Sequence, residues 1–98
     1  MFSSVPTVVS GDFEWDDAKA ASNLAKHGVS FDEAATALVD PAAVFLDDGE
    51  HPDRVIAIGM SAAARVLCVV HVERGARERI ISARCATAPE ESLYSGGP

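Results

Sequence analysis

The sequence predicts an α+β domain, with an antiparallel sheet of three to four strands and two N-terminal helices packed on one face of that sheet. Residues 16–40 space their apolar side chains as helices do. Residues 43–86 instead form short runs rich in β-branched residues, separated by turns. Helices followed by strands, without alternation, are typical of the α+β class. The 98 residues suffice for a single domain with one core.

Two consecutive helices are expected after a short strand at residues 13–15. Asp16 is the expected N-cap of the first helix, and Gly28 suits the left-handed residue that ends it. Ser30 and Glu33 have the spacing of a capping box for the second helix, which Asp40-Pro41 ends. The expected apolar stripes are Ala18, Ala21, Leu24 and Ala25 in the first helix, and Phe31, Ala34, Ala35, Leu38 and Val39 in the second.

The strands are expected to form an antiparallel meander. A short strand at 43–47 and a polar loop precede three β-rich runs at 54–60, 65–73 and 78–86. The tail has room for one helical turn near 89–93. The expected organisation is a flexible N-terminal extension over 1–12, a single domain over 13–94 and a disordered tail over 95–98.

Charge is distributed unevenly along the chain, whose net charge is −7. Residues 54–87 carry six Arg against two Glu, whereas residues 1–53 carry two Lys against eleven acidic residues, and the tail adds two Glu. The net charge alone argues against a nucleic-acid partner. The segregation of charge instead predicts one surface that holds an anion and another that faces a basic partner.

The hairpin over residues 65–84 concentrates the polar residues that could carry chemistry. With Gly75-Ala76 as a two-residue turn, Arg74 opposes Arg77 and His71 opposes Ile80. The expected core face carries Val66, Cys68, Val70, Val72, Ile81, Ala83 and Cys85, with Arg79 near its end. The expected polar face carries Arg65, Leu67, Val69, His71, Glu73, Ile80, Ser82 and Arg84. A three-residue turn would move one strand to the opposite face.

Arginines beside a histidine suit phosphodiester chemistry. Guanidinium groups bind phosphate oxygens with two parallel hydrogen bonds and stabilise the charge of the transition state. A His or Glu can transfer a proton near neutral pH, and the 2′-hydroxyl of RNA supplies the nucleophile without a metal. A solvated sheet face explains the same alternation of polar residues, so the pattern by itself leaves both interpretations open.

Two long segments resemble the BrnT family of small toxins. FEWDDAKAASNLAKHGVSFDEAATALVDP resembles the family's FEWD…KA..N..KHGVSFEEA opening, and RVIAIGMSAAARVLCVVHVERGARERIISARCAT resembles its R…IG…R.L.VVH.ER…RIISAR.A. signature. The resemblance implies the toxin half of a type II toxin–antitoxin pair, with a RelE-like ribonuclease fold. It also implies a partner antitoxin with a ribbon-helix-helix DNA-binding domain, with which the toxin represses its own operon in the cytoplasm. A complex of two toxins and two antitoxins is expected.

The resemblance assigns roles to polar residues of this chain. It implies a metal-independent endoribonuclease that cleaves by 2′-hydroxyl attack, without a cofactor. The implied catalytic residues are His71, Glu73, Arg79 and Arg84, with His71 as the proton-transfer group, and Lys26 and Arg74 are implied to assist RNA binding. Arg65 and Arg77, in the same basic segment, are further expected RNA-binding residues. Other matching polar positions are His27 and Glu90. Lys26-His27 could instead only complement a helix dipole.

The segment after Arg84 departs from the family pattern. Family members continue with basic residues, whereas this chain continues with Cys85–Ala88, Pro89 and the acidic pair Glu90-Glu91. Fewer positive charges weaken non-specific RNA binding. The alternative function is therefore a catalytically weak antitoxin-binding module that acts in complex formation and autoregulation.

The cysteines and the apolar runs bear on whether the chain holds a metal, crosses a membrane or is exported. Cys68 and Cys85 lie inside expected strands and lack metal-ligand spacing, so they are expected to be free thiols rather than part of a metal site. No run approaches the about 20 apolar residues of a membrane-spanning helix, and residues 1–12 do not resemble a signal peptide. A cytoplasmic protein without a membrane partner is expected.

Overall fold

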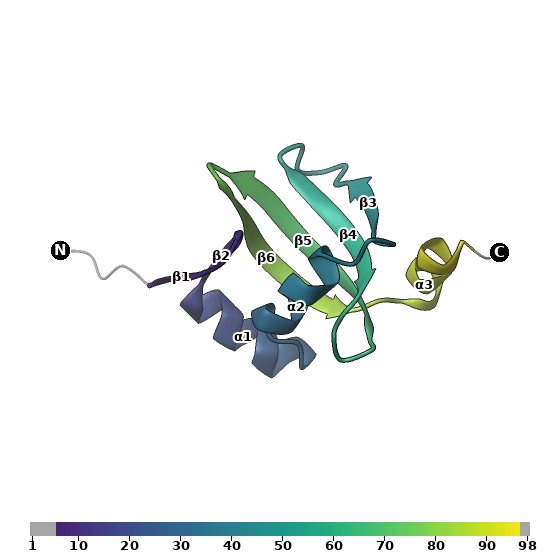
Figure 1. Cartoon of the computed structure of the whole chain (residues 1–98), viewed down its shortest axis with the longest axis horizontal. Helices are drawn as coiled ribbons and strands as arrows, with labels where there is room; N and C mark the ends of the chain where they lie inside the picture. The colour runs from purple at the N-terminus through teal and green to yellow at the C-terminus, as the bar shows by residue number, and fades with distance from the viewer. Residues whose placement is uncertain (1–5, 97–98) are drawn as a thin grey trace.

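The protein forms a six-stranded mixed sheet with three helices over residues 6–96, the part that this computed structural model describes (Figure 1). In chain order the elements are β1 (Thr7–Ser10), β2 (Phe13–Asp16), α1 (Asp17–His27), α2 (Phe31–Leu38), β3 (Val44–Asp47), β4 (Arg54–Met60), β5 (Val66–Arg74), β6 (Arg77–Cys85) and α3 (Ala88–Ser95). The strands lie in the order β1-β2-β6-β5-β4-β3.

The α+β class is confirmed, but the expected sheet of three to four antiparallel strands is wrong. β2 and β6 pair in parallel through Phe13 with Glu78 and Glu14 with Arg79. β1 extends the sheet by pairing with β2, so the expected flexible extension does not hold for Thr7–Ser10. A short hairpin with Gly11 at φ +60° makes that extra strand possible. Residues 1–5 lie outside the described residues.

The expected capping residues of the two N-terminal helices are confirmed. The Asp16 carboxylate accepts a hydrogen bond from the Lys19 N–H at 3.0 Å, and Gly28 ends α1 at φ +70°. The Ser30 hydroxyl accepts from the Glu33 N–H at 3.0 Å. The Glu33 side chain does not complete the capping box and instead binds Arg65, as described below.

The main core lies between α2 and the sheet. Its buried members come from β2, the α1–α2 junction, α2, β5 and β6, and they are Trp15, Val29, Phe31, Ala34, Ala37, Leu67, Val69, Ile80 and Ala83. The rings of Trp15 and Phe31 meet edge to face, with centroids 6.0 Å apart. Gly59 allows α2 to approach β4, because a Cβ atom there would lie 2.4 Å from the Ala37 carbonyl oxygen.

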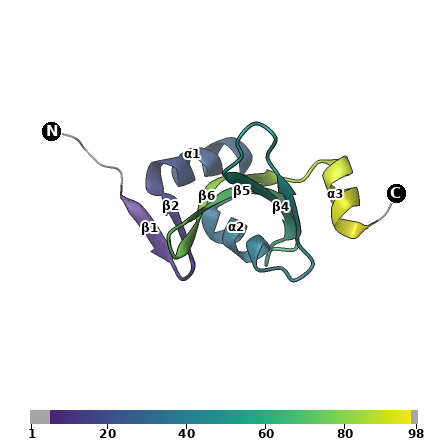
Figure 2. The ribbon, with the colours of Figure 1, turned by 90° about the horizontal axis from the view of Figure 1, so that it is seen from above.

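The expectation that both N-terminal helices pack on one face of the sheet is wrong. α2 packs against β4, β5 and β6, whereas α1 lies along the edge of β6 beyond the short β2 pairing (Figures 1 and 2). The expected stripe of Ala18, Ala21, Leu24 and Ala25 is exposed, and α1 buries Asn23 instead. In α2, Phe31, Ala34 and Ala37 are buried, while Val39 is 64% exposed.

The C-terminal segment folds further than expected. α3 has eight residues rather than one turn, and Ser95 belongs to it rather than to a disordered tail. Its N-terminus forms a capping box, in which the Thr87 hydroxyl accepts from the Glu90 N–H and the Glu90 carboxylate accepts from the Thr87 N–H. The Tyr94 hydroxyl donates to the Asp40 carboxylate at 2.6 Å, which ties α3 to the end of α2. Residues 97 and 98 lie outside the described part.

Candidate functional site

A bulge in β6 decides which polar residues of the β5–β6 hairpin share a face. The expected turn is confirmed, because Arg74 pairs with Arg77 and His71 with Ile80. Val70 then pairs with Ser82 rather than Ile81, so the ladder contains one extra residue. Every residue of β6 beyond Ile81 therefore lies on the face opposite to the one that unbroken alternation predicts.

The expected core and polar faces of the hairpin are wrong, in β6 because of this bulge and in β5 because the side that faces α2 is the one expected to be polar. Leu67 and Val69, placed on the polar face, are fully buried beneath α2, and His71 lies with them on that side. The other side of the sheet, which α3 covers beside Met60 and Val66, we call the open face. It carries Arg54, Ile56, Ile58 and Met60 of β4, Val66, Cys68, Val70, Val72 and Arg74 of β5, and Arg77, Arg79, Ser82 and Arg84 of β6.

Asn23 fixes α1 to the edge of β6. Its side-chain amide donates to the Ala83 carbonyl at 2.8 Å, and its carbonyl accepts from the Ala83 N–H at 3.1 Å, as a neighbouring strand would do. A further bond to the Val29 carbonyl at 2.9 Å holds the α1–α2 junction. Asn23 is 7% exposed and these bonds use three of its four hydrogen-bonding positions. The residue thus replaces a missing strand and positions α1.

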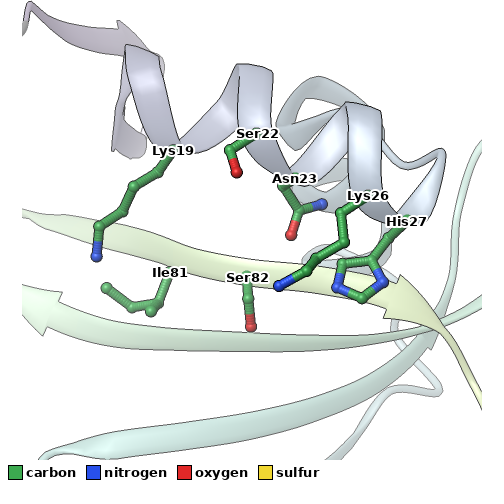
Figure 3. Close-up of a pocket in the computed structure, with 7 residues that line it drawn as sticks. All are labelled: Lys19, Ser22, Asn23, Lys26, His27, Ile81 and Ser82. Atoms are coloured by element: carbon green, nitrogen blue, oxygen red, sulfur yellow. The ribbon is translucent and has the colours of Figure 1, made fainter.

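This placement creates a hollow of about 190 Å³ between α1 and β6, lined by Lys19, Ser22, Asn23, Lys26, His27, Ile81 and Ser82. We call it the α1–β6 hollow. Figure 3 shows the Lys19 and Lys26 side chains extending from α1 past β6, beside Ile81 and Ser82. Its lining contains two lysines, a histidine and no carboxylate. An anion therefore suits this hollow better than a cation.

Arg84 is held by Glu90 of α3. The two N–H groups of its guanidinium donate to the two carboxylate oxygens at 2.8 and 3.0 Å. This pairing, helped by the Thr87 backbone, lowers the pKa of Glu90 to about 2, and it raises the pKa of Arg84. A carboxylate with so low a pKa is a weak base at neutral pH. Glu90 therefore positions Arg84 and occupies the side of its guanidinium that could bind a phosphate.

Arg79 is also paired, with Glu14 of β2 at 2.6 Å, and both side chains are largely buried. Arg79 lies on the same side of the sheet as Val72, as expected, but this side is the open face rather than the core. The two turn arginines, Arg74 and Arg77, are exposed at the far end of the hairpin. The Arg77 guanidinium donates to the Gly11 carbonyl at 3.3 Å.

His71 lies on the opposite side of the sheet from Arg84. Its Nδ1 atom is 2.6 Å from a Glu78 carboxylate oxygen, and its Nε2 atom is buried without a partner among the described residues. The Phe45 ring meets the imidazole edge to face, with centroids 6.1 Å apart. Glu73 lies on the same side as His71, directly opposite Glu78, and is exposed. The structure thus separates His71 and Glu73 from the arginines of the open face.

Arg65 joins α1, α2 and the β4–β5 turn. Its guanidinium donates to both Glu33 oxygens at 2.9 and 2.5 Å and to the Gly28 carbonyl at 3.1 Å. The Ser61 hydroxyl donates to the same carboxylate at 2.6 Å, and these bonds lower the pKa of Glu33. With these partners, Arg65 serves the packing of the helices. Among the expected RNA-binding residues, Lys26 is the one that lines the α1–β6 hollow.

Within residues 6–96 the structure contains no cluster of three or more His, Cys, Asp or Glu side chains that could hold a metal ion. Both cysteines are free. Burial raises the pKa of Cys68 to about 11, so this residue opposite Arg84 is a neutral thiol at pH 7 rather than a nucleophile. In the same part of the chain, no helix has the length and apolarity needed to cross a membrane.

Lys19, Asn23 and Glu14 were not predicted from the sequence, and Glu90 was named there only as a matching position, without its pairing to Arg84. One signal for Asn23 was present, because it is the single amide in an alanine-rich helix and matches the Asn of the N..KHG motif. The search for an apolar helical stripe could not identify Asn23, because that pattern is defined by apolar residues only. The ion pairs depend on β2 and α3, whose positions no short-range pattern predicts.

Comparison with known proteins shows the family and a similar fold. The family described as "Ribonuclease toxin, BrnT, of type II toxin-antitoxin system" matches residues 15–90. The crystal structure of the ribonuclease toxin BrnT of Brucella abortus is similar, with a TM-score of 0.61 and 29% identity over 74% of this chain and 92% of that one. No curated protein matches. Because the family match spans most of the sequence, including α1, the hairpin and Glu90, the chain belongs to the BrnT family of ribonuclease toxins of type II toxin–antitoxin systems.

Proposed function

We propose that the open face and the α1–β6 hollow bind RNA, and that this chain is a metal-independent endoribonuclease. The observation that carries the proposal is the α1–β6 hollow, where Lys19 and Lys26 extend over the edge of the sheet next to Ser82, with no carboxylate in the lining. Arg84 lies two residues further along β6, on the same face as Ser82. In a chain of net charge −7, such a local cationic surface favours a phosphate-rich ligand.

The proposed reaction is attack of an RNA 2′-hydroxyl on the adjacent phosphorus. The new bond joins the 2′-oxygen to phosphorus, and the bond to the 5′-oxygen breaks. A base removes the proton of the 2′-hydroxyl, and an acid delivers a proton to the leaving 5′-oxygen. The products are a 2′,3′-cyclic phosphate and a 5′-hydroxyl, and the substrate itself supplies the nucleophile. Guanidinium groups stabilise the charge that develops on the phosphoryl oxygens.

The proposed roles are assigned to residues of the open face and of the α1–β6 hollow. Arg84 binds the scissile phosphate once Glu90 releases its guanidinium, and Lys26 holds a neighbouring phosphate. His27, which lines the α1–β6 hollow, takes the proton-transfer role, because His71 lies across the sheet, bonded to Glu78. A histidine changes charge near neutral pH and can serve as either base or acid.

The arginines nearer the hairpin turn extend the same surface. Arg79 can bind a phosphate there once Glu14 releases its guanidinium, and the exposed Arg74 and Arg77 contact RNA further along the strand. Their contribution is to docking, because each phosphate that a cation neutralises strengthens binding without selecting a sequence.

An RNA cleavage assay in the presence of EDTA tests this proposal. Purified chain is incubated with a defined RNA, and the ends of the products are identified. We expect cleavage with cyclic phosphate ends, a loss of about 10²–10³-fold in rate for Arg84→Ala and a loss of about 10²-fold or more for His27→Ala. His51→Ala is the matched control, since His51 is exposed in the β3–β4 loop. Equal rates for His27→Ala and His51→Ala would exclude His27 from proton transfer.

A second function has its own supporting observation. Glu14 and Glu90 neutralise two arginines of the open face, Arg79 and Arg84. A catalytically weak chain that acts mainly by binding its antitoxin accounts for these pairs. That function predicts a stable antitoxin complex together with intact RNA and normal growth when the chain is induced alone.

The family supplies the proposed cellular setting. We expect an antitoxin with a ribbon-helix-helix domain to neutralise this chain in the cytoplasm, in a complex of two toxins and two antitoxins. That complex would contact DNA through the antitoxin and repress its own operon. Sizing the purified complex and measuring its binding to its promoter, with and without this chain, tests both expectations.

A further inference from the structure

The side of the sheet that faces away from the proposed RNA site contains a second hollow, of about 320 Å³. The lining combines aromatic and aliphatic walls with acidic residues and a histidine: Asp12, Phe13, Leu38, Phe45, His71 and Glu78. A neighbouring depression shares Asp12 and Phe13 and continues along α2 past Asp32 and Val39. We call the two together the His71 groove.

His71 is the unexplained group in this groove. Its side chain is 6% exposed, and Nε2 is buried without a hydrogen-bond partner among the described residues. A buried polar atom without a hydrogen-bond partner destabilises the fold. In the neutral tautomer whose Nδ1 donates its proton to Glu78, Nε2 is an acceptor and would be satisfied by an N–H donor. The nearby Phe45 is 54% exposed, so little packing opposes rotation of its ring away from the imidazole.

The charge of the His71 groove selects the ligand. Its lining contains three carboxylates, from Asp12, Asp32 and Glu78, and no lysine or arginine. Phosphate-rich ligands are repelled by such a surface, whereas a basic side chain is attracted to it. The exposed apolar residues Phe45 and Val39, which are 54% and 64% exposed, offer contact area for the aliphatic part of that side chain.

We infer that the His71 groove binds a basic segment of the partner antitoxin. A lysine or arginine of that segment enters beside Glu78, its stem packs on Phe13 and Phe45, and its N–H group donates to His71 Nε2. Flanking apolar residues of the segment cover Val39. This inference uses the pairing with an antitoxin that the family implies and does not depend on RNA cleavage.

Binding of purified full-length chain to the antitoxin encoded beside it tests this inference by titration calorimetry. We expect Asp12→Lys and Asp32→Lys each to raise the dissociation constant at least tenfold. Glu50→Lys, an equal charge reversal in the exposed β3–β4 loop, should change it less than twofold. Circular dichroism of each variant checks that the fold is retained. Equal affinities for all three variants, or no binding by the wild-type chain, would overturn the inference.

The ring nitrogens of His71 provide a second readout, by NMR of the ¹⁵N-labelled chain. We expect the Nε2 resonance to shift when the antitoxin is added and to stay unchanged when a short RNA is added. A shift caused by RNA, or by raising the concentration of the chain alone, would assign the groove to RNA or to a second copy and overturn the inference. RNA cleavage by Asp12→Lys, measured without antitoxin, should match wild type. Failure of cleavage in every variant, with the expected affinities intact, would contradict the proposed ribonuclease activity alone.

Discussion

Replacing Glu90 with Gln should strengthen RNA binding, because the Glu90 carboxylate competes with a phosphate for Arg84. The guanidinium donates two hydrogen bonds to that carboxylate, at 2.8 and 3.0 Å, and a phosphate would accept the same two. The Arg84 side chain is 42% exposed, so solvent screens the pair and its contribution is about 1 kcal/mol. Removing that competition corresponds to about a fivefold tighter dissociation constant.

The assay is fluorescence anisotropy with a labelled single-stranded RNA over a range of salt concentrations. One additional phosphate contact should steepen the slope of log K against log salt by about 0.7. Glu91→Gln is the matched control, because it removes the same charge from an exposed residue of α3 that lies outside the Arg84–Glu90 ion pair. An equal increase in RNA affinity for the two substitutions would show that the change in net charge alone causes the effect. Weaker binding by Glu90→Gln would refute the competition and show that RNA binds Arg84 while Glu90 still holds it.

Three further predictions concern stability, measured by urea denaturation. Asn23→Leu should lower the free energy of unfolding by about 2–4 kcal/mol, because the buried N–H and carbonyl of Ala83 lose their partner. Gly59→Ala should cost about 1–3 kcal/mol, since the added Cβ would lie 2.4 Å from the Ala37 carbonyl oxygen; an unchanged midpoint would contradict the close approach of α2. The pKa of Glu90 is lowered to about 2, so its ion pair stabilises the fold above about pH 4.5 and this contribution is lost as the pH falls toward 2. Glu90→Gln should therefore flatten the stability profile below pH 5.

The helices and the hairpin turn could be predicted because local chemistry determines them. Asp16, Ser30 and Gly28 act on backbone groups within a few residues, and all three do so in the structure. The Gly75-Ala76 turn likewise determines the pairing of Arg74 with Arg77. These are short-range effects, which a sequence displays directly.

The candidate site could not be predicted to the same extent, because one extra residue in β6 changes the side of the sheet on which the following residues lie. The extra residue Ile81 moves Ser82 and Arg84 to the open face and leaves His71 beneath α2. Both sides of β5 carry apolar residues, Leu67 and Val69 on one side and Cys68 and Val70 on the other. The sequence therefore does not show which side faces the core. The parallel pairing of β2 with β6 is a long-range contact without a local signal.

The measurement that most directly tests whether the open face is the RNA site is NMR mapping of RNA binding on the ¹⁵N-labelled chain. A short non-cleavable RNA, with 2′-methoxy groups in place of 2′-hydroxyls, is titrated into the protein. We expect the largest shifts at Lys26, Ser82 and Arg84, around the α1–β6 hollow, and none at His71 or Phe45. Shifts centred on His71 and Phe45, with Ser82 and Arg84 unchanged, would contradict the assignment of RNA to the open face.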